Sequence, residues 1–191
     1  MNDLLQGTSV FLVGMMGSGK STVGRLLAHQ LGYRFYDSDV VIERVADKTI
    51  NQIFADDGKE SFRQLESQVL SQLSAQIRSI IATGGGIVMQ QLNWSYLHHG
   101  LVIWLDAPVD VLIDRLREDT TRPLLQQENP IQTLQNIFDQ RRNLYAEADL
   151  HIRISAEDTP EQIVSRIIAE IPTVLKSPAI APSPPNEGIS N

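Results

Sequence analysis

Residues 14–21 read Gly-Met-Met-Gly-Ser-Gly-Lys-Ser, which is the G-x-x-x-x-G-K-S pattern of a phosphate-binding loop. The apolar run at 8–13 that precedes it is typical of a buried parallel strand. After the motif, apolar residues recur at helical spacing from Val23 to Leu31. The motif therefore lies between a strand and a helix, which is the context in which it binds phosphate. A glycine-rich turn without a ligand is the alternative, and the flanking pattern argues against it.

Each part of this loop has a physical reason. The glycines at 14, 17 and 19 admit backbone angles that other residues avoid, so successive N–H groups can converge on one phosphate. The helix that begins near Lys20 adds free N–H groups and the positive end of its dipole. We expect Lys20 to reach the outer phosphates of a nucleotide and the Ser21 hydroxyl to bind magnesium.

Composition limits the classes of function. The 191 residues suffice for one globular domain, and 42% of them are hydrophobic. The net charge of -7 argues against a general nucleic-acid binder, and the lack of cysteine excludes disulfides and cysteine-ligated metals. The N-terminal residues lack the basic segment of a signal peptide, and no apolar run approaches transmembrane length. We therefore expect a cytoplasmic protein.

Strand and helix patterns alternate along the chain, which predicts an α/β fold with a mostly parallel sheet and helices on both faces. Strands are predicted at 8–13, 34–36, 79–83, 101–105 and 151–154. Helices are predicted at 20–31, 40–46, 90–99, 109–117, 131–147 and 160–171, with two more within 49–76. Those two break near Asp57 and Gly58, and either Ser61 caps the second or Lys59 and Glu60 belong to its first turn.

Two segments differ in character from the rest of the chain. Residues 118–130 are polar and weakly periodic, which is typical of a mobile lid. Residues 173–191 are rich in Pro, Ser and Ala, which indicates a disordered tail. We therefore expect a single domain over 1–172.

Ligands of such sheets bind at the carboxyl ends of the strands, and polar or glycine-rich residues follow three of them. Asp37 and Asp39 come after the second strand, on one side of the chain if it stays extended there. One of them could cap the next helix, but beside a phosphate-binding loop the pair suits magnesium binding and activation of a hydroxyl. Residues 84–86 are all glycine after the third strand, which permits close approach of a ligand to the backbone.

A series of short motifs in fixed order carries a family resemblance. The loop at 14–21 is followed by Asp-Ser-Asp at 37–39, Ser-Phe-Arg-Gln-Leu-Glu at 61–66 and Thr-Gly-Gly-Gly at 83–86. Thr-Arg-Pro-Leu-Leu at 121–125 comes next, and Arg141 then precedes Tyr145 by four residues. In order and spacing these motifs resemble those of the shikimate kinases over residues 7–171.

This resemblance implies transfer of the γ-phosphate of ATP to the 3-hydroxyl of shikimate, giving shikimate 3-phosphate and ADP on the route to chorismate and the aromatic amino acids. It also implies a P-loop fold like that of nucleoside monophosphate kinases, with a five-stranded parallel sheet in the order 2-3-1-4-5. ATP would be the co-substrate and one Mg2+ ion per subunit the cofactor. Shikimate and ATP would be the partners of a monomer that binds neither nucleic acid nor membranes.

The resemblance assigns residue roles by position. The catalytic residues would be Lys20, Asp39 and Arg122, the last of them in the lid. ATP would be bound by Gly17, Ser18, Gly19, Lys20, Ser21, Thr22, Arg115, Arg122 and Pro160, with Arg115 and Pro160 on either side of adenine. Shikimate would be bound by Asp39, Arg63, Gly84, Gly85, Gly86 and Arg141. The two arginines would grip its carboxylate, Glu66 would support that site, and Ser21 and Asp37 would hold magnesium.

One position departs from the family pattern, and other functions remain open. Asn143 stands where the family usually has proline, so Arg142 could compete with Arg141 for the carboxylate. A related kinase acting on gluconate or a nucleoside monophosphate is the second hypothesis. A nucleotide-binding regulator without catalysis is the third. Asp39, Arg63, the three glycines and Arg141 together favour a hydroxylated ring with one carboxylate.

Overall fold

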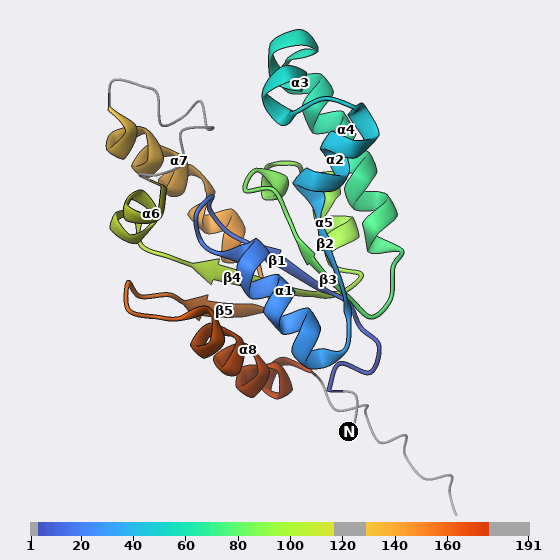
Figure 1. The fold of residues 1–191 in the computed structure, drawn as a ribbon, viewed down its shortest axis with the longest axis vertical. Helices are drawn as coiled ribbons and strands as arrows, with labels where there is room; N and C mark the ends of the chain where they lie inside the picture. Colours follow the sequence, from blue (N-terminus) through green and yellow to red (C-terminus); the bar gives the residue numbers. More distant parts are fainter. Residues whose placement is uncertain (1–3, 117–128, 176–191) are drawn as a thin grey trace, which may run out of the picture.

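The sheet is parallel throughout and has five strands in the order β2-β3-β1-β4-β5 (Figure 1). The structure is a computed structural model that describes residues 4–116 and 129–175. The strands are β1 (Val10–Val13), β2 (Arg34–Asp37), β3 (Ser79–Ala82), β4 (Leu101–Asp106) and β5 (Leu150–Arg153). The predicted fold class and the strand order implied by the resemblance are both confirmed.

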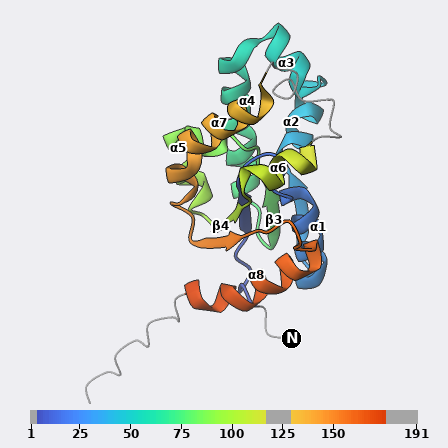
Figure 2. The same cartoon turned by 90° about the vertical axis from the view of Figure 1, so that its left-hand side faces the viewer.

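Helices cover both faces of this sheet, as predicted. They are α1 (Lys20–Leu31), α2 (Ser38–Ala46), α3 (Ile50–Asp56), α4 (Gly58–Ser74), the short 3-10 helix η1 (Ile87–Met89), α5 (Gln91–Leu97), α6 (Val109–Leu116), α7 (Pro130–Tyr145) and α8 (Pro160–Val174). In Figure 2, α1 lies on one side of the sheet and α5 and α7 on the other. Helix α8 packs against α1 and β5. In the part of the chain that the structure describes, every helix is too short or too polar to cross a membrane.

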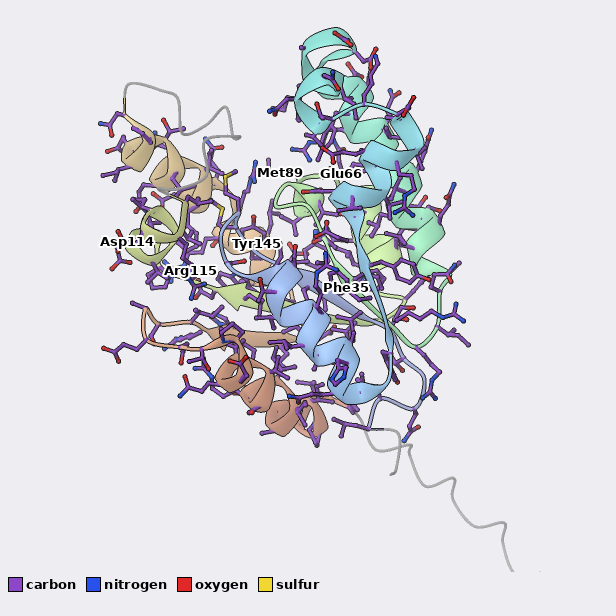
Figure 3. The ribbon with its side chains drawn as sticks, in the orientation of Figure 1. Phe35, Glu66, Met89, Asp114, Arg115 and Tyr145 are labelled. Atoms are coloured by element: carbon purple, nitrogen blue, oxygen red, sulfur yellow. The ribbon has the colours of Figure 1, made fainter. Side chains whose placement is uncertain are left out.

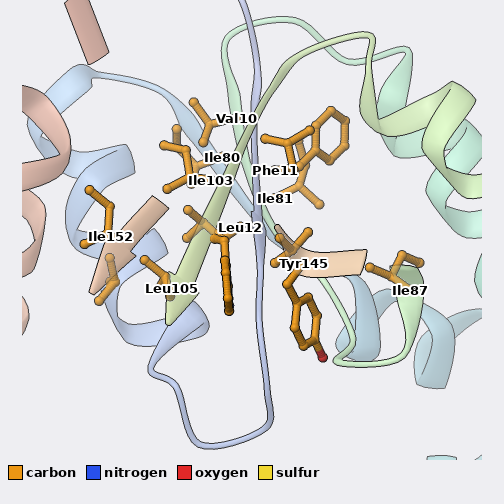
Figure 4. Close-up of a cluster of buried hydrophobic side chains, with 14 of the residues drawn as sticks. Val10, Phe11, Leu12, Ile80, Ile81, Ile87, Ile103, Leu105, Tyr145 and Ile152 are labelled. Carbon is orange, nitrogen blue, oxygen red and sulfur yellow. The ribbon is translucent and has the colours of Figure 1, made fainter. Parts of the chain in front are cut away.

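The core fixes the position of the strand ends. All four residues of β1 are fully buried, and their side chains alternate between the two faces of the sheet. Figure 4 shows Val10 and Phe11 on opposite faces, with Ile81, Ile87 and Tyr145 on the side of Phe11. Each such side chain contributes about 1.5–3 kcal/mol when it is removed from water. The loop that follows β1 therefore starts from a rigid base.

Several boundaries differ from the predicted ones for local reasons. Helix α2 begins at Ser38, because the Asp37 side chain accepts a hydrogen bond from the Asp39 N–H and caps it. Helix α4 begins at Gly58, so Lys59 and Glu60 form its first turn and Ser61 is not a cap. The 3-10 turn η1 was not predicted, since three residues give too short a pattern.

The predicted boundary of the tail at 173 is wrong. Helix α8 continues through Pro172 to Val174, although proline removes one hydrogen bond from the helix. Val174 and Leu175 lie three and four residues after the buried Ile171, so they continue its apolar face and pack against the core. This packing extends the ordered domain past the predicted boundary. The rest of the predicted tail, 176–191, lies outside the described residues.

Candidate active site

A cleft of about 600 Å³ opens at the carboxyl ends of the strands. Parallel pairing brings the loops after β1, β2 and β3 to the same edge of the sheet, and the α6 and α8 ends complete the wall. The lining includes Gly17, Gly19, Lys20, Ser21, Thr22, Asp37, Asp39, Thr83, Gly85, Arg115, Asp158 and Pro160. The structure thus brings together in one space residues that the sequence scatters over more than 140 positions.

The phosphate-binding loop is closely packed against β4 and α6. Gly14 has a φ of +140°, and a Cβ there would lie 2.6 Å from the Leu105 carbonyl oxygen. Gly17 has a φ of +78° and lies against Leu116. Ser18 is fully buried beneath the loop and does not line the cleft, so its predicted contact with ATP would come from its backbone. Glycine is required at 14 for space as well as for conformation.

Lys20 is the first residue of α1 and is held inside the loop. Its side chain is 8% exposed, and Nζ donates to the carbonyl oxygens of Gly14 at 2.8 Å and Met15 at 2.7 Å. The ammonium group is therefore fixed at the centre of the loop by backbone dipoles. A phosphate bound to the loop N–H groups would meet this charge at close range.

Asp37 connects the loop to α2. Its Oδ2 accepts a hydrogen bond from the Ser21 hydroxyl at 2.5 Å, while Oδ1 accepts from the Asp39 N–H at 3.1 Å. One residue thus serves as helix cap and as partner of the loop. The expectation that Asp37 and Asp39 share one side of an extended segment is wrong, because Asp39 lies in the first turn of α2. Both still face the same cleft.

The hydroxyl of Ser21 and the carboxylate of Asp37 are oxygen ligands of the kind that Mg2+ prefers. Among the residues that the structure describes, no group of three or more His, Cys, Asp or Glu side chains could hold a metal by itself. The pair therefore fits an ion that takes its remaining ligands from nucleotide phosphates and water.

Arg115 and Pro160 both line the cleft. The Arg115 Nη1 atom lies 3.5 Å from the carbonyl oxygens of Gly17 and Ser18, and Pro160 is the first residue of α8 after the Thr159 cap. Figure 3 shows Arg115 on α6 and Glu66 on α4, with Tyr145 between them in this view. Both predicted adenine neighbours therefore lie on the same cleft as the phosphate-binding loop.

The three glycines at 84–86 are crowded by acidic and basic side chains. A Cβ at Gly84 would lie 2.9 Å from Asp39 Oδ1 and 2.9 Å from Glu66 Oε1, and one at Gly86 would overlap the Arg63 guanidinium. The Gly84 N–H donates to the buried Ser38 hydroxyl at 3.0 Å. These glycines therefore allow the polar side chains of α2 and α4 to approach the backbone.

Arg63 and Glu66 form a short ion pair one turn apart on α4. The Glu66 side chain is 1% exposed, and burial raises the pKa of its carboxyl group, although the positive charge of Arg63 opposes the shift. The charges of Asp39 and Arg141 also act on this carboxyl group. Two guanidinium groups and two carboxyl groups thus gather around the glycines, which gives a site for a ligand with hydroxyls and a carboxylate.

Helix α7 brings Arg141, and not Arg142, to this cluster. The Arg141 Nη1 atom donates to the Gly85 carbonyl oxygen at 3.0 Å, whereas Arg142 is exposed. Asn143, the departure from the family pattern, is also exposed and leaves the helix unbroken. The geometry therefore favours Arg141 of the two arginines.

Sequence reasoning missed two residues that support the cluster. Tyr145 donates from its hydroxyl to the Gly85 carbonyl oxygen at 2.5 Å, and Ser38 accepts from Gly84. The spacing of Arg141 and Tyr145 was the signal for the first, since four residues make one face of a helix. The predicted lid at 118–130, with Arg122, lies almost wholly outside the described residues, and α7 already begins at Pro130.

A second groove of about 650 Å³ lies between α4 and α5 and includes Arg63 at its edge. Its lining is mainly amide and hydroxyl side chains of α4, with the carboxylate of Glu60. It contains neither the glycine loop nor Asp37 and Asp39. The cleft at the strand ends is therefore the candidate active site.

Comparison with known proteins gives a clear assignment. The sequence profile of the shikimate kinase family matches residues 16–172. The chain belongs to the shikimate kinase family. A shikimate kinase of Microcystis aeruginosa is 57% identical over 172 residues, which cover 90% of each chain. Membership makes the chain an ATP-dependent phosphotransferase with an alcohol group as acceptor.

Solved structures separate this family from its fold neighbours. Shikimate kinase from Acinetobacter baumannii in complex with shikimate has a TM-score of 0.82 and 38% identity, and covers 91% of this chain and 98% of its own. A gluconokinase from Sinorhizobium meliloti has a TM-score of 0.55 at 18% identity, with 87% of this chain and 93% of its own covered. The second likeness shows a shared fold alone.

The buried carboxyl group of Glu66 gives a testable dependence of stability on pH. Its pKa in the folded protein lies above the ordinary value of 4.5, so the folded state holds this proton more tightly than the unfolded state. The contribution of Glu66 to the free energy of unfolding is then full below about pH 4.5 and is lost as pH rises through the folded-state pKa. We expect the Glu66→Gln variant to lack this loss of stability with rising pH.

The measurement is urea unfolding of both proteins from acid to neutral pH. The stability of the wild type relative to Glu66→Gln should fall as pH rises across this window. The control is Glu60→Gln, which changes a carboxylate on the exposed first turn of the same helix. The stability of the wild type relative to this variant should not fall in this way. If the stability of the wild type relative to Glu66→Gln instead grew with pH, the raised pKa of Glu66 would be contradicted.

Proposed function

We propose that this chain transfers the γ-phosphate of ATP to the 3-hydroxyl of shikimate, with Lys20 and the loop around it as donor half and Asp39, Arg63 and Arg141 as acceptor half. One observation carries the proposal. A phosphate-binding loop and a pair of guanidinium groups flank the same three glycines, with a carboxylate on the rim of the cleft. Shikimate has hydroxyls for the carboxylate and one carboxylate for the guanidinium groups.

The donor half supplies positive charge where the γ-phosphate is transferred. The loop N–H groups and the start of α1 hold the phosphates, and Lys20 neutralises the charge that spreads over the transferring group. Ser21 and Asp37 would hold magnesium, which would supply further positive charge to the transferring group. Gly17, Ser18, Gly19 and Thr22 contribute backbone or first-turn contacts to the same phosphates. Phosphoryl transfer needs mainly this positioning and charge stabilisation.

The acceptor half orients the hydroxyl. Asp39 accepts its hydrogen bond and takes its proton as the new phosphate ester forms, while Arg63 and Arg141 hold the carboxylate at the other end of the ring. Gly84, Gly85 and Gly86 leave room for the ring beside the backbone. Glu66 acts on Arg63, whose guanidinium group it holds by the ion pair.

The remaining roles extend the same proposal. Arg115 and Pro160 enclose adenine, and Arg122 closes over the phosphates from the lid and helps to exclude water. The chain acts as a single kinase domain, as a monomer and in the cytoplasm. These assignments follow from the family resemblance, the position of Arg115 and Pro160 on the cleft, and the composition of the chain.

The other two hypotheses are less well supported. A gluconate or nucleoside monophosphate kinase would share the fold, but the solved gluconokinase has only 18% identity to this chain. A regulator without catalysis would not need Lys20, Asp37 and Asp39 on one cleft. The acceptor half therefore favours shikimate.

An acceptor comparison tests the activity itself. Release of ADP from ATP and magnesium should require shikimate, and gluconate or AMP should give no rate above the background hydrolysis. Lys20→Met should lower kcat at least about 100-fold, because it removes the charge beside the transferring phosphate. Lys48→Met is the matched control, since Lys48 lies on the surface with Asp56 and Asp57 and should keep the wild-type rate. A faster reaction with gluconate or AMP would refute the proposed acceptor.

Substitution of the two neighbouring arginines tests the carboxylate site. Arg141→Ala should raise the KM for shikimate about 10- to 100-fold, because it removes a charge-assisted pair of hydrogen bonds, and should leave the KM for ATP unchanged. Arg142→Ala should change neither constant, because its side chain is exposed. Steady-state kinetics with each substrate varied in turn measures the KM for shikimate and the KM for ATP of each variant. The reverse pattern would assign the carboxylate to Arg142.

Substitution of a glycine tests the crowding at the acceptor half. Gly86→Ala should displace the Arg63 guanidinium and raise the KM for shikimate at least about tenfold, because the added Cβ occupies its place. Gly32→Ala, at the end of α1, adds backbone strain where no atom lies within 4 Å, so it should lower the melting temperature without changing either KM. Unchanged shikimate kinetics in Gly86→Ala would show that Arg63 does not bind the acceptor.

A further inference from the structure

Tyr145 is a fully buried residue whose hydroxyl reaches two loops of the active site. It lies at the end of α7, and its ring packs against that of Trp104 with 5.8 Å between centroids. Its hydroxyl donates to the Gly85 carbonyl oxygen at 2.5 Å and lies 3.6 Å from the Met15 sulfur in the phosphate-binding loop. In Figure 4 the hydroxyl oxygen points away from the apolar side chains around the ring.

The same carbonyl oxygen also binds Arg141. Arg141 and Tyr145 are four residues apart on α7, so they lie on one face of the helix, and both donate to Gly85. A carbonyl oxygen has two lone pairs, and these two donors use both. Arg141 commits only part of its guanidinium group in this way, because the group has five N–H donors in a fixed plane. The remaining donors are available to a carboxylate.

Arg141 is thus held by the Gly85 carbonyl oxygen and also interacts with the Tyr145 hydroxyl itself. Gly85 has no side chain that could fix its peptide group. Glycine admits more backbone conformations than other residues, so a second donor restricts the rotation of the peptide that carries the Gly85 carbonyl. The Tyr145 hydroxyl supplies the second donor from a rigid, buried ring. Burial also raises the pKa of this hydroxyl, so it keeps its proton and stays a donor across the physiological range.

We propose that Tyr145 is a positioning residue for the acceptor: its hydroxyl fixes the Gly85 carbonyl, which in turn holds the Arg141 guanidinium in the plane that receives the substrate carboxylate. This inference rests on the proposed function, in which Arg141 binds the carboxylate of shikimate. Tyr145 itself does not touch the substrate. Its effect should therefore appear in the binding of the acceptor and depend on Arg141.

Tyr145→Phe removes the hydroxyl and keeps the ring against Trp104. We expect the KM for shikimate to rise about three- to tenfold, the range of one lost hydrogen bond, while the KM for ATP and kcat stay within about twofold. In the Arg141→Ala background the same substitution should change kcat/KM for shikimate by less than about twofold, because the residue through which it acts is gone. This double-mutant cycle is measured by ADP release with each substrate varied.

Tyr33→Phe is the matched control. Tyr33 is also buried and its hydroxyl also binds a backbone group, the Gly7 N–H at 3.2 Å, but it lies at the other end of the sheet. It should lower the melting temperature and leave both KM values unchanged, which separates loss of a buried hydroxyl from loss of positioning.

Two results would overturn the inference. The first is a Tyr145→Phe protein that is less stable but has the wild-type KM for shikimate. The second is a Tyr145→Phe substitution that lowers kcat/KM for shikimate by the same factor in the wild-type and the Arg141→Ala backgrounds. Failure of the proposed function is a different result, because the wild-type protein would then give no ADP release that depends on shikimate. The wild-type assay and the cycle therefore test the two proposals separately.

Discussion

Close contact between the phosphate-binding loop and the glycines at 84–86 is the constraint on which the site depends. A Cβ at Gly85 would lie only 3.4 Å from the Gly14 carbonyl oxygen and the Met16 nitrogen, so the two loops are separated by about one methyl group. Thr83 strengthens the contact by donating to the Leu12 carbonyl oxygen from both its N–H and its hydroxyl. The proposed donor and acceptor halves consequently share one wall, as in-line transfer between two substrates requires.

The two guanidinium groups beside this wall are held in different ways. Glu66 is almost fully buried and is tolerated there because Arg63 pairs with it, while Asp39 remains on the cleft. Arg141 approaches from the opposite side on α7 and is held by a neutral carbonyl oxygen. One guanidinium group is therefore oriented by a charge and the other by a dipole. Both keep donors for a ligand, because a guanidinium group has more N–H groups than either partner uses.

Fold and substrate choice are carried by different parts of the molecule. The sheet and the helices that cover it form a fold that this chain shares with a gluconokinase at 18% identity. The residues that we propose to bind the acceptor come from α2, α4 and α7, which stand around the strand ends in Figure 1. Under this proposal, a change of acceptor would involve these helices and leave the phosphate-binding loop unchanged.

The sequence alone determined the alternation of strands and helices and the position of the glycine loop from Gly14 to Ser21 at the junction of β1 and α1, because these depend on local patterns of apolar residues and on glycine conformations. Its ordered motifs also indicated the family and the residues of both halves of the site. Only the tertiary structure distinguished Arg141 from Arg142, since adjacent residues on a helix point about 100° apart and the packing of α7 decides which one faces Gly85. It alone revealed the dual bonding of Asp37 and the hydroxyl of Tyr145 at Gly85, because such contacts join residues up to 60 positions apart and leave no local pattern in the chain.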